Sequence, residues 1–368
     1  MNIGFVGWRG LVGSVLMQRI EEEKDFEDCQ CDRTFFSTSN VGGEGPEGSV
    51  LKDANNVSLL KNCDVIVTCQ GSSWTKEIYP QLRNVGWSGI WLDASSALRM
   101  EKDSIIVLDP LNREQIISGL KNGIKTFVGG NCTVSLMLMA CHGLFKNNLV
   151  EWINSMTYQA ASGAGSQYIK ELLRQMEKIG YVNALAENIS SGILEIDREI
   201  SNLLNSLNFP CESFKVPLAC SLIPWIGSYF INGQTKEEWK GFAEGNKILG
   251  LAEPIPISGI CVRVGVMRCH SQALLIKLKR HTSIEEIEQI ISAANEWVKV
   301  VPNNEEETIH RLTPAAVSGK LTIAVGRINE VLIGNEYIQL FTVGDQLLWG
   351  AAEPIRRALC IIWQEKYS

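Results

Sequence analysis

The stretch "NIGFVGWRGLVGSVL", residues 2–16, decides the fold of this chain. A short apolar run leads into Gly7, and apolar residues at helical spacing begin at Leu11. Gly7, Gly10 and Gly13 follow one another in the spacing GxxGxxG at this strand-to-helix junction. Glycines there let the backbone approach a pyrophosphate, and the helix N-terminus faces its negative charge. The stretch therefore predicts a variant of the dinucleotide-binding turn; a tight turn without a ligand is the alternative.

The rest of the first third of the chain repeats this alternation of strand and helix signals. Short apolar runs recur between helix-like or turn-rich stretches, and several of them end in Ser, Asn, Gln or Gly. Such runs are typical of buried parallel strands whose carboxyl ends carry a binding site. The runs are "TFFSTS", "CDVIVTCQG", "GIWLDASS" and "SIIVLDP".

The pattern of apolar residues changes near residue 130. Longer strands are expected in "INSMTYQAASG", "GICVRVGVMRCHSQALLIKLKR" and "GRINEVLIGNEYIQLFTVGD", with helices near residues 165–206 and 283–299. We therefore expect an α/β protein with an N-terminal Rossmann-like dinucleotide-binding domain, residues 1–130. An α+β catalytic domain with a mixed sheet, residues 131–352, is expected to follow. The amphipathic segment 353–368 is expected to form a helix that packs back on the first domain.

The overall composition excludes several classes of function. The 368 residues carry a net charge of −7, so nothing draws the whole chain to nucleic acid or to an anionic membrane. The eleven cysteines form no CxxC pair and no zinc-like spacing, and no metal site is expected. The chain opens without a basic and apolar leader, and its longest apolar run is too short to span a bilayer. These features favour a reduced, cytoplasmic protein.

The end of the second expected strand bears on the choice of cofactor. An NAD site usually carries Asp or Glu there, to bind the ribose hydroxyls. Here "TFF" is followed by Ser37, Thr38, Ser39 and Asn40, which are uncharged hydrogen-bonding residues. Arg9, in the glycine turn, could meet a 2′-phosphate. The pattern favours NADP over NAD.

A cysteine stands at a second strand-to-helix junction, in "FVGGNCTVSLMLMACHG", residues 127–143. An apolar run ends at two glycines, and Cys132 opens a helix-like segment behind Asn131. The N-terminus of a helix stabilises a thiolate and lowers its pKa, which suits a nucleophile. A small buried hydrophobic residue is the alternative, because most free cysteines are of that kind.

Several blocks of the sequence, taken in order, resemble the aspartate-β-semialdehyde dehydrogenases, in the form typical of Gram-negative bacteria. The resemblance runs nearly from end to end of the chain, and blocks in order are more specific than any single motif. The blocks are "GFVGWRGLVGSVLMQR", "FFSTS", "VTCQG", "SSALRM", "FVGGNCTVSLMLM", "TYQAASG", "EEWKG", "CVRVG", "RCHSQA", "LTPAAV" and "FTVGDQLLWGAAEP".

The resemblance implies a reaction. Cys132, as a thiolate, would attack the aldehyde of L-aspartate 4-semialdehyde, and hydride transfer to NADP would leave a thioester. Inorganic phosphate would then release L-aspartyl-4-phosphate, and in the cell the reaction would run in the reverse direction. The resemblance also implies a role in the biosynthesis of lysine and diaminopimelate, threonine, methionine and isoleucine. It implies a homodimer, with the second domain as the dimerisation domain.

The resemblance further assigns a role to individual residues. His270 would be the acid/base that relays the proton of the hemithioacetal hydroxyl, whereas by itself it would be read as a structural residue of a strand. Gln159 would orient the thiol and the substrate. Arg263 would clamp the α-carboxylate with its planar fork, and Glu237 would meet the α-amino group. The phosphate-binding residues would be Arg99, Lys240 and Asn131.

The resemblance extends to the cofactor site. The implied residues are Gly7, Arg9, Gly10, Leu11, Val12, Thr38, Ser39, Gln70, the loop 162–166 with Ser162 and Gly163, and Gln346 near the nicotinamide. The chain departs from the family pattern at Ala164, where a glycine is usual, and at Ser190, where a proline is common. Both departures concern the cofactor loop rather than the reaction.

One geometric difficulty concerns Arg263 and His270, which are seven residues apart. An unbroken strand would point them to opposite faces, so the chain must bend between them, and Gly265 is the expected place.

Two other functions compete with the one that the resemblance implies. Other acyl-phosphate reductases use the same chemistry of a thiolate, a hydride and a phosphate. Glu237 argues against them, because its carboxylate would bind a free amino group and not an acetylated or hydroxylated substrate. A non-catalytic NADPH-binding sensor would not need the pair Cys132 and His270.

Overall fold

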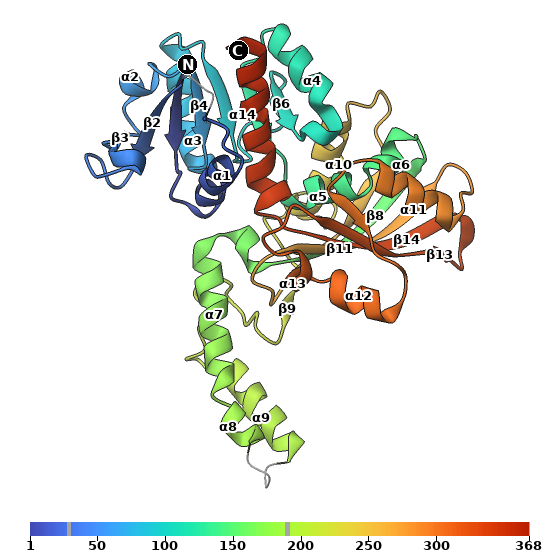
Figure 1. Ribbon diagram of the computed structural model, residues 1–368. Coiled ribbons are helices and arrows are strands. Elements are labelled where there is room, and N and C mark those ends of the chain that lie inside the picture. Colours follow the sequence, from blue (N-terminus) through green and yellow to red (C-terminus); the bar gives the residue numbers. More distant parts are fainter. Residues whose placement is uncertain (28–30, 188–191, 368) are drawn as a thin grey trace.

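The computed structural model describes residues 1–27, 31–187 and 192–367. Within them the chain forms two seven-stranded sheets, with helices packed on both and a helical arm that projects away from the body (Figure 1). Ser190, one of the departures noted above, lies outside the described residues.

The first sheet is parallel throughout, in the order β3-β2-β1-β4-β5-β7-β6. Chain order reverses at β1, which has β2 on one side and β4 on the other; a ligand of such a sheet binds at the carboxyl edge of that point. The predicted Rossmann-like domain is confirmed. Its strands are β1 Asn2–Val6, β2 Asp32–Ser37, β3 Lys52–Asp53, β4 Val65–Thr68, β5 Ile90–Asp93, β6 Ser104–Val107 and β7 Thr126–Gly129. Its helices are α1 Leu11–Glu22, α2 Val57–Leu60, α3 Ser72–Asn84 and α4 Asp109–Lys121.

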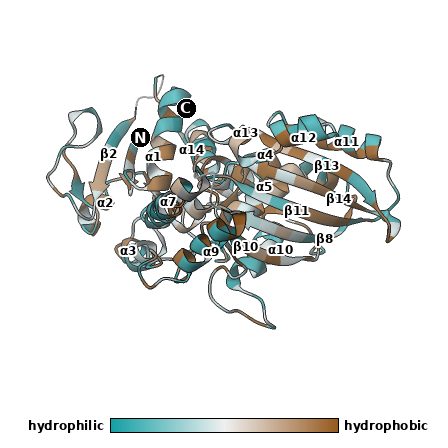
Figure 2. Ribbon diagram, turned by 90° about the horizontal axis from the view of Figure 1, so that it is seen from below, coloured by the Kyte–Doolittle hydropathy of each residue, from teal (hydrophilic) through white to brown (hydrophobic). Residues whose placement is uncertain are grey.

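The second sheet is mixed, as predicted, in the order β12-β13-β14-β11-β8-β10-β9. The β10–β8 and β12–β13 pairs are parallel and the other pairs are antiparallel. Four of its strands, β8, β11, β13 and β14, are seen side by side from below in Figure 2. The strands are β8 Val150–Gln159, β9 Leu222–Ile223, β10 Ile257–Val264, β11 His270–Leu278, β12 Val298–Val300, β13 Ile323–Val331 and β14 Gly334–Gly344.

Helices cover one face of the second sheet and share a buried apolar core with it. They are α5 Cys132–Ala140, α6 His142–Lys146, α10 Lys236–Leu249 and α11 Ile284–Ala293. The helix expected near 283–299 therefore ends at Ala293, and the short strand β12 follows it. The short helices α12 Glu305–Arg311 and α13 Pro314–Val317 lie between β12 and β13 in sequence.

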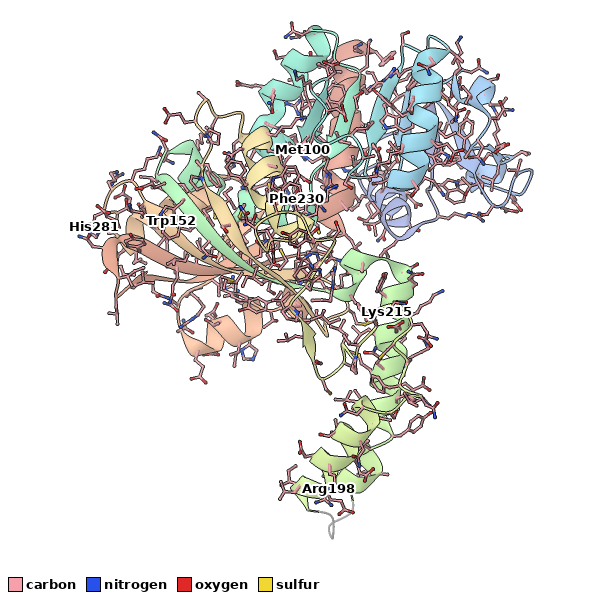
Figure 3. The ribbon with its side chains drawn as sticks, turned by 180° about the vertical axis from the view of Figure 1, so that it is seen from behind. Met100, Trp152, Arg198, Lys215, Phe230 and His281 are labelled. Atoms are coloured by element: carbon pink, nitrogen blue, oxygen red, sulfur yellow. The ribbon has the colours of Figure 1, made fainter. Side chains whose placement is uncertain are left out.

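The described residues of the segment expected to be helical near 165–206 form the arm, which points away from both sheets in Figure 1 and, seen from behind, in Figure 3, where Arg198 is labelled near its far end. It consists of α7 Ser166–Gly180, α8 Asn183–Ala186 and α9 Ile193–Leu204. A short 3₁₀ turn, η2 Ala161–Ala164, joins the arm to the end of β8.

The final helix, α14 Glu353–Lys366, follows a π-helical turn, η3 Leu348–Ala352. Its apolar side belongs to the same buried cluster as the strands of the first sheet. Arg357 holds it to α4 through a two-pronged ion pair with Asp109, at 2.7 to 2.9 Å. The guanidinium also lies over the Trp297 ring, 4.8 Å from its centroid. Among the described residues no helix is long and apolar enough to cross a membrane.

Candidate active site

Cys132 is the first residue of α5 and lies three residues beyond the end of β7. Asn131 caps the helix, because its Oδ1 accepts the backbone N–H groups of Thr133 and Val134 at 3.0 and 3.3 Å. The protein around the sulfur raises the pKa of Cys132 to about 11, because burial disfavours the thiolate and Glu237 adds negative charge. The expected lowering of the thiol pKa is therefore wrong, because burial is the largest contribution and raises it.

His270 lies beside the thiol. Its Nε2 is 3.2 Å from Cys132 Sγ, and its Nδ1 accepts the backbone N–H of Ala160 at 3.0 Å. The ring is 1% exposed. Burial, helped by the charge of Arg263, lowers the pKa of His270 to about 3. The imidazole is therefore neutral at ordinary pH.

Arg263 and His270 reach one site from two different strands. The first lies on β10 and the second begins β11, and β8 runs between these strands. The expected bend at Gly265 is therefore present, whereas the single long strand expected in "GICVRVGVMRCHSQALLIKLKR" is wrong, because the stretch forms two strands, β10 and β11. A tight turn does cross Gly265, closed by the N–H of Val266 on the carbonyl of Val264 at 2.7 Å, but the chain then passes over the end of β8 to the far side.

Gln159, Glu237 and Lys240 form a hydrogen-bonded group next to the thiol. Glu237 Oε2 accepts from Lys240 Nζ at 2.8 Å, and Oε1 accepts from Asn131 Nδ2 at 2.9 Å and Gln159 Nε2 at 3.3 Å. Burial alone would raise the pKa of Glu237, but the charge and hydrogen bond of Lys240 hold it at about 2. The carboxylate is therefore ionised, and it already has a cationic partner.

Arg99 is held by a residue that the sequence analysis missed, Glu244 of α10. The guanidinium donates to the carbonyls of Gly129 and Gly130 at 2.7 and 3.0 Å, and to Glu244 Oε1 at 3.1 Å. The other oxygen of Glu244 accepts the backbone N–H of Asn131 at 2.7 Å. Glu244 thus fixes both Arg99 and the loop before Cys132. Its position seven residues after Glu237, on the same side of a helix, is the signal that could have revealed it.

These side chains surround one cavity of about 270 Å³. Gly163 lines it as well, and a Cβ on Gly163 would lie 2.9 Å from His270 Cε1 and 3.0 Å from Arg263 Nη1. Gln346 lies at its edge and joins two loops, since it accepts the N–H of Cys269 at 2.6 Å and donates to Ser162 Oγ. His270 and Gln159 contact the wall of the cavity through the bonds described above. The predicted site residues in its wall are Val12, Arg99, Asn131, Cys132, Ser162, Gly163, Glu237, Lys240, Arg263 and Gln346.

A second cavity, of about 520 Å³, lies over the glycine turn. Gly7 has a φ of +74°, and a Cβ on Gly13 would lie 2.2 Å from the Gly7 carbonyl oxygen, so both positions require glycine. Arg9 lies over the Trp8 ring, and its Nη2 is 3.4 Å from Ser37 Oγ. The backbone is thus open to a close-lying pyrophosphate, which fits a dinucleotide. The predicted cofactor residues in its wall are Gly7, Arg9, Gly10, Thr38, Ser39 and Gln70.

Leu11, predicted as a cofactor residue, packs against the core of the first sheet. In the part of the chain that the structure describes, no group of three or more His, Cys, Asp and Glu residues is placed to hold a metal ion.

Comparison with known proteins finds two family models. The model "Semialdehyde dehydrogenase, NAD binding domain" matches residues 2–118, and "Semialdehyde dehydrogenase, dimerisation domain" matches residues 141–349. Among solved structures, an aspartate semialdehyde dehydrogenase from Francisella tularensis is 49% identical, with a TM-score of 0.94, over 98% of this chain and 99% of that one.

Two more distant structures share the fold. One is aspartate semialdehyde dehydrogenase II from Vibrio cholerae, complexed with ASA, which is 21% identical with a TM-score of 0.80, over 100% of this chain and 99% of that one. The other is the Candida albicans enzyme with NADP, which is 15% identical with a TM-score of 0.66, over 99% of this chain and 98% of that one.

Proposed function

The chain belongs to the aspartate semialdehyde dehydrogenase family, and on that basis we propose that it interconverts L-aspartyl-4-phosphate and L-aspartate 4-semialdehyde with NADP. The observation that carries the proposal is the approach of Cys132 Sγ to His270 Nε2, at 3.2 Å, beside a cavity walled by Arg99, Lys240 and Arg263. A nucleophile and three cations in one cavity suit a small anionic acyl phosphate. The product would feed the biosynthesis of lysine and diaminopimelate, threonine, methionine and isoleucine.

The substrate would be held through its α-carboxylate and α-amino groups. Arg263 donates one N–H to the carbonyl of Ala160 at 2.7 Å, which fixes the plane of its guanidinium and leaves the other N–H groups for a carboxylate. Glu237 is ionised and suits an ammonium group. Because Lys240 Nζ is paired with Glu237 Oε2 at 2.8 Å, the substrate ammonium would replace it there. Gln159, bonded to Glu237 at 3.3 Å, would orient the substrate beside the thiol.

The phosphate group would be bound by Arg99 and Lys240, with Asn131 beside them. Three of the five guanidinium N–H groups of Arg99 are bonded to protein, and two are left for a ligand. Lys240, once displaced from Glu237 by the substrate ammonium, would carry its full charge to the phosphate. Occupation of the substrate and phosphate subsites would thus be linked through one carboxylate.

Catalysis would proceed through a thioester on Cys132. The sulfur would attack the acyl carbon as phosphate leaves, and a nicotinamide cofactor, when bound, would supply the hydride that reduces the thioester. Arg263, Glu237 and Gln159 keep the acyl carbon at the sulfur through this exchange. The uncharged residues Thr38 and Ser39, with Arg9 nearby, support NADP rather than NAD.

We further propose that residues 1–130 and the helix 353–368 form the dinucleotide-binding domain, and that residues 131–352 form the catalytic and dimerisation domain. Two copies would associate through the second domain. In support, the face of the second sheet away from its covering helices exposes apolar side chains, among them Tyr158, Leu222 and Ile260. We propose no nucleic-acid or membrane partner.

The test is a nicotinamide assay in the oxidative direction. Purified protein with L-aspartate 4-semialdehyde and NADP should form reduced cofactor only when inorganic phosphate is present. Single-turnover reaction without phosphate should trap an acyl group on Cys132, which mass spectrometry detects and Cys132→Ala lacks. An equal rate with an N-acetylated aldehyde would point instead to another acyl-phosphate reductase. No turnover with any aldehyde would refute the proposal.

A further inference from the structure

The residue before His270 has an unusual backbone conformation. Cys269 has a φ of +78°, in the left-handed region that residues other than glycine rarely adopt. Of the eight non-glycine residues with positive φ in the described part of the chain, seven are exposed and Cys269 is buried. This conformation costs free energy relative to negative φ, so contacts with neighbouring segments must hold it.

Gln346 makes the hydrogen bond that holds this peptide. Its Oε1 accepts the backbone N–H of Cys269 at 2.6 Å, and the two residues are 2% and 1% exposed. A backbone N–H can only donate, so the amide must present its oxygen there, and its Nε2 then donates to Ser162 Oγ. If the Gln346 side chain turned away, the N–H of Cys269 would be buried without an acceptor, which is unfavourable.

The amide connects the two loops that lie beside the His270 ring. The loop 160–163 supplies the backbone N–H that faces His270 Nδ1, and the loop 266–269 leads into His270 at the start of β11. Two backbone hydrogen bonds, at 2.8 and 3.2 Å, join these loops. Gln346 adds a connection from a third segment, and it is bonded to the residue next to His270.

Gln346 itself lies on a fixed segment. The preceding residue, Asp345, has a fully buried side chain that accepts the N–H of Gly319 at 2.7 Å and that of Leu347 at 2.9 Å. The carboxylate also forms an ion pair with Arg268, with 2.7 Å between Oδ2 and Nε. The segments on both sides of Cys269 are therefore attached to the loop that carries Gln346.

We infer that Gln346 is a positioning residue for His270: by accepting the Cys269 N–H, it holds the left-handed backbone that directs the imidazole at Cys132 Sγ. This role needs no contact with the nicotinamide. Without the bond, Cys269 would relax toward negative φ in part of the molecules, and these would lose the 3.2 Å approach of Nε2 to the sulfur. The effect on turnover rests on the proposed function, whereas the placement of the ring does not.

The first test measures the reactivity of the thiol without any cofactor. Gln346→Leu removes the acceptor at similar side-chain volume. Alkylation of Cys132 by iodoacetamide, followed by mass spectrometry of its peptide, should be at least about fivefold slower, because the sulfur loses the imidazole that takes its proton. A residue that acts only on the cofactor predicts an unchanged rate, which would overturn the inference.

The second test asks whether the backbone of Cys269 transmits the effect. Glycine adopts positive φ without strain and alanine does not, so Cys269→Gly and Cys269→Ala form a matched pair. Combined with Gln346→Leu, Cys269→Gly should give an alkylation rate at least about threefold above that of Cys269→Ala. With Gln346 intact the two rates should be similar. Equal rates beside Gln346→Leu, or the same ratio in both backgrounds, would overturn the inference.

Urea unfolding provides a control at a second buried cysteine. Cys261 lies in β10 and is not among the residues with positive φ, so Cys261→Gly should be less stable than Cys261→Ala. At Cys269 the order should be reversed, and the same order at both positions would overturn the inference. If Gln346→Leu does not fold, adding Cys269→Gly should restore folding and adding Cys269→Ala should not; failure of both would overturn it.

Turnover separates this inference from the proposed function. If the proposed function is right, kcat for L-aspartate 4-semialdehyde should follow the order of the alkylation rates in the four combinations at positions 269 and 346. An order that differs would overturn the inference. If no aldehyde is turned over, the proposed function fails, and the alkylation rates still decide whether Gln346 positions His270.

Discussion

Gly163→Ala should slow the enzyme by placing one methyl group against two side chains of the site. The new Cβ would lie 2.9 Å from His270 Cε1 and 3.0 Å from both His270 Nε2 and Arg263 Nη1. Ordinary contact begins at 3.4 Å, so the imidazole must move by about 0.5 Å. Gly163 is not among the residues with positive φ, so the backbone accepts alanine without strain. The effect of the substitution is therefore steric.

The size of the effect follows from the bond that is disturbed. A shift of this size away from the sulfur would lengthen the 3.2 Å contact between His270 Nε2 and Cys132 Sγ to about 3.7 Å and weaken it. A hydrogen bond to a charged sulfur contributes about 1.5–3 kcal/mol. Because the bond is weakened rather than lost in the transition state, kcat/KM should decrease by up to roughly 100-fold.

The assay is kcat/KM for L-aspartate 4-semialdehyde, with thermal unfolding measured beside it. Gly180→Ala, at the end of α7, is the matched control, because a Cβ there meets open space. It should keep the rate of the unmodified protein. An unchanged kcat/KM for Gly163→Ala would refute the reasoning, and so would an equal loss in the control.

Four further outcomes are expected. Cys132→Ala should abolish turnover while NADP binding, followed by fluorescence, stays within a few-fold; measurable turnover would contradict the thioester route. Arg263→Lys keeps the charge but loses the planar fork of the guanidinium. The transition-state stabilisation obtained from kcat/KM for the aldehyde should therefore fall by about 2–4 kcal/mol, while the KM for phosphate changes little. Equal changes for the aldehyde and for phosphate would indicate one shared basic pocket. Arg357→Lys should lower the free energy of unfolding in urea by about 1.5–3 kcal/mol, because the two-pronged bond to the buried Asp109 is lost. Since burial lowers the pKa of His270 from 6.5 to about 3, the unfolded chain binds a proton that the folded chain does not, and stability falls as pH drops below 6.5; His270→Asn should flatten that slope between pH 6.5 and 5, by up to about 1.4 kcal/mol per pH unit.

Local features of the fold and the site could be predicted from the sequence. The glycine turn is visible because backbone geometry at Gly7 and Gly13 demands glycine, and the first sheet is visible because its buried strands are short apolar runs. The position of Cys132 at a strand-to-helix junction could also be predicted, because Asn131 is a residue type that caps helices and does cap this one. Each of these signals lies within a few neighbouring residues.

What the sequence could not reveal depends on contacts between distant segments. The chain between Arg263 and His270 crosses the end of β8, a pairing that periodicity within one segment cannot show. The pKa of Cys132 is raised chiefly by burial, which depends on the whole fold and not on the residues next to the thiol in sequence. Ala160 contacts His270 and Arg263 only through its backbone, so no property of its side chain marks it.

The position of α14 has a consequence for how the protein is made. Ile355 and Leu359, near the end of the chain, share a buried cluster with Ile3 and Phe5, near its start. A ribosome adds about 5–20 residues each second, so the first strand waits on the order of 20–70 s for this partner. During that time the nascent chain carries an open apolar groove, which a chaperone would be well suited to cover. Stop codons late in the message should therefore yield aggregated protein rather than a shortened but folded product.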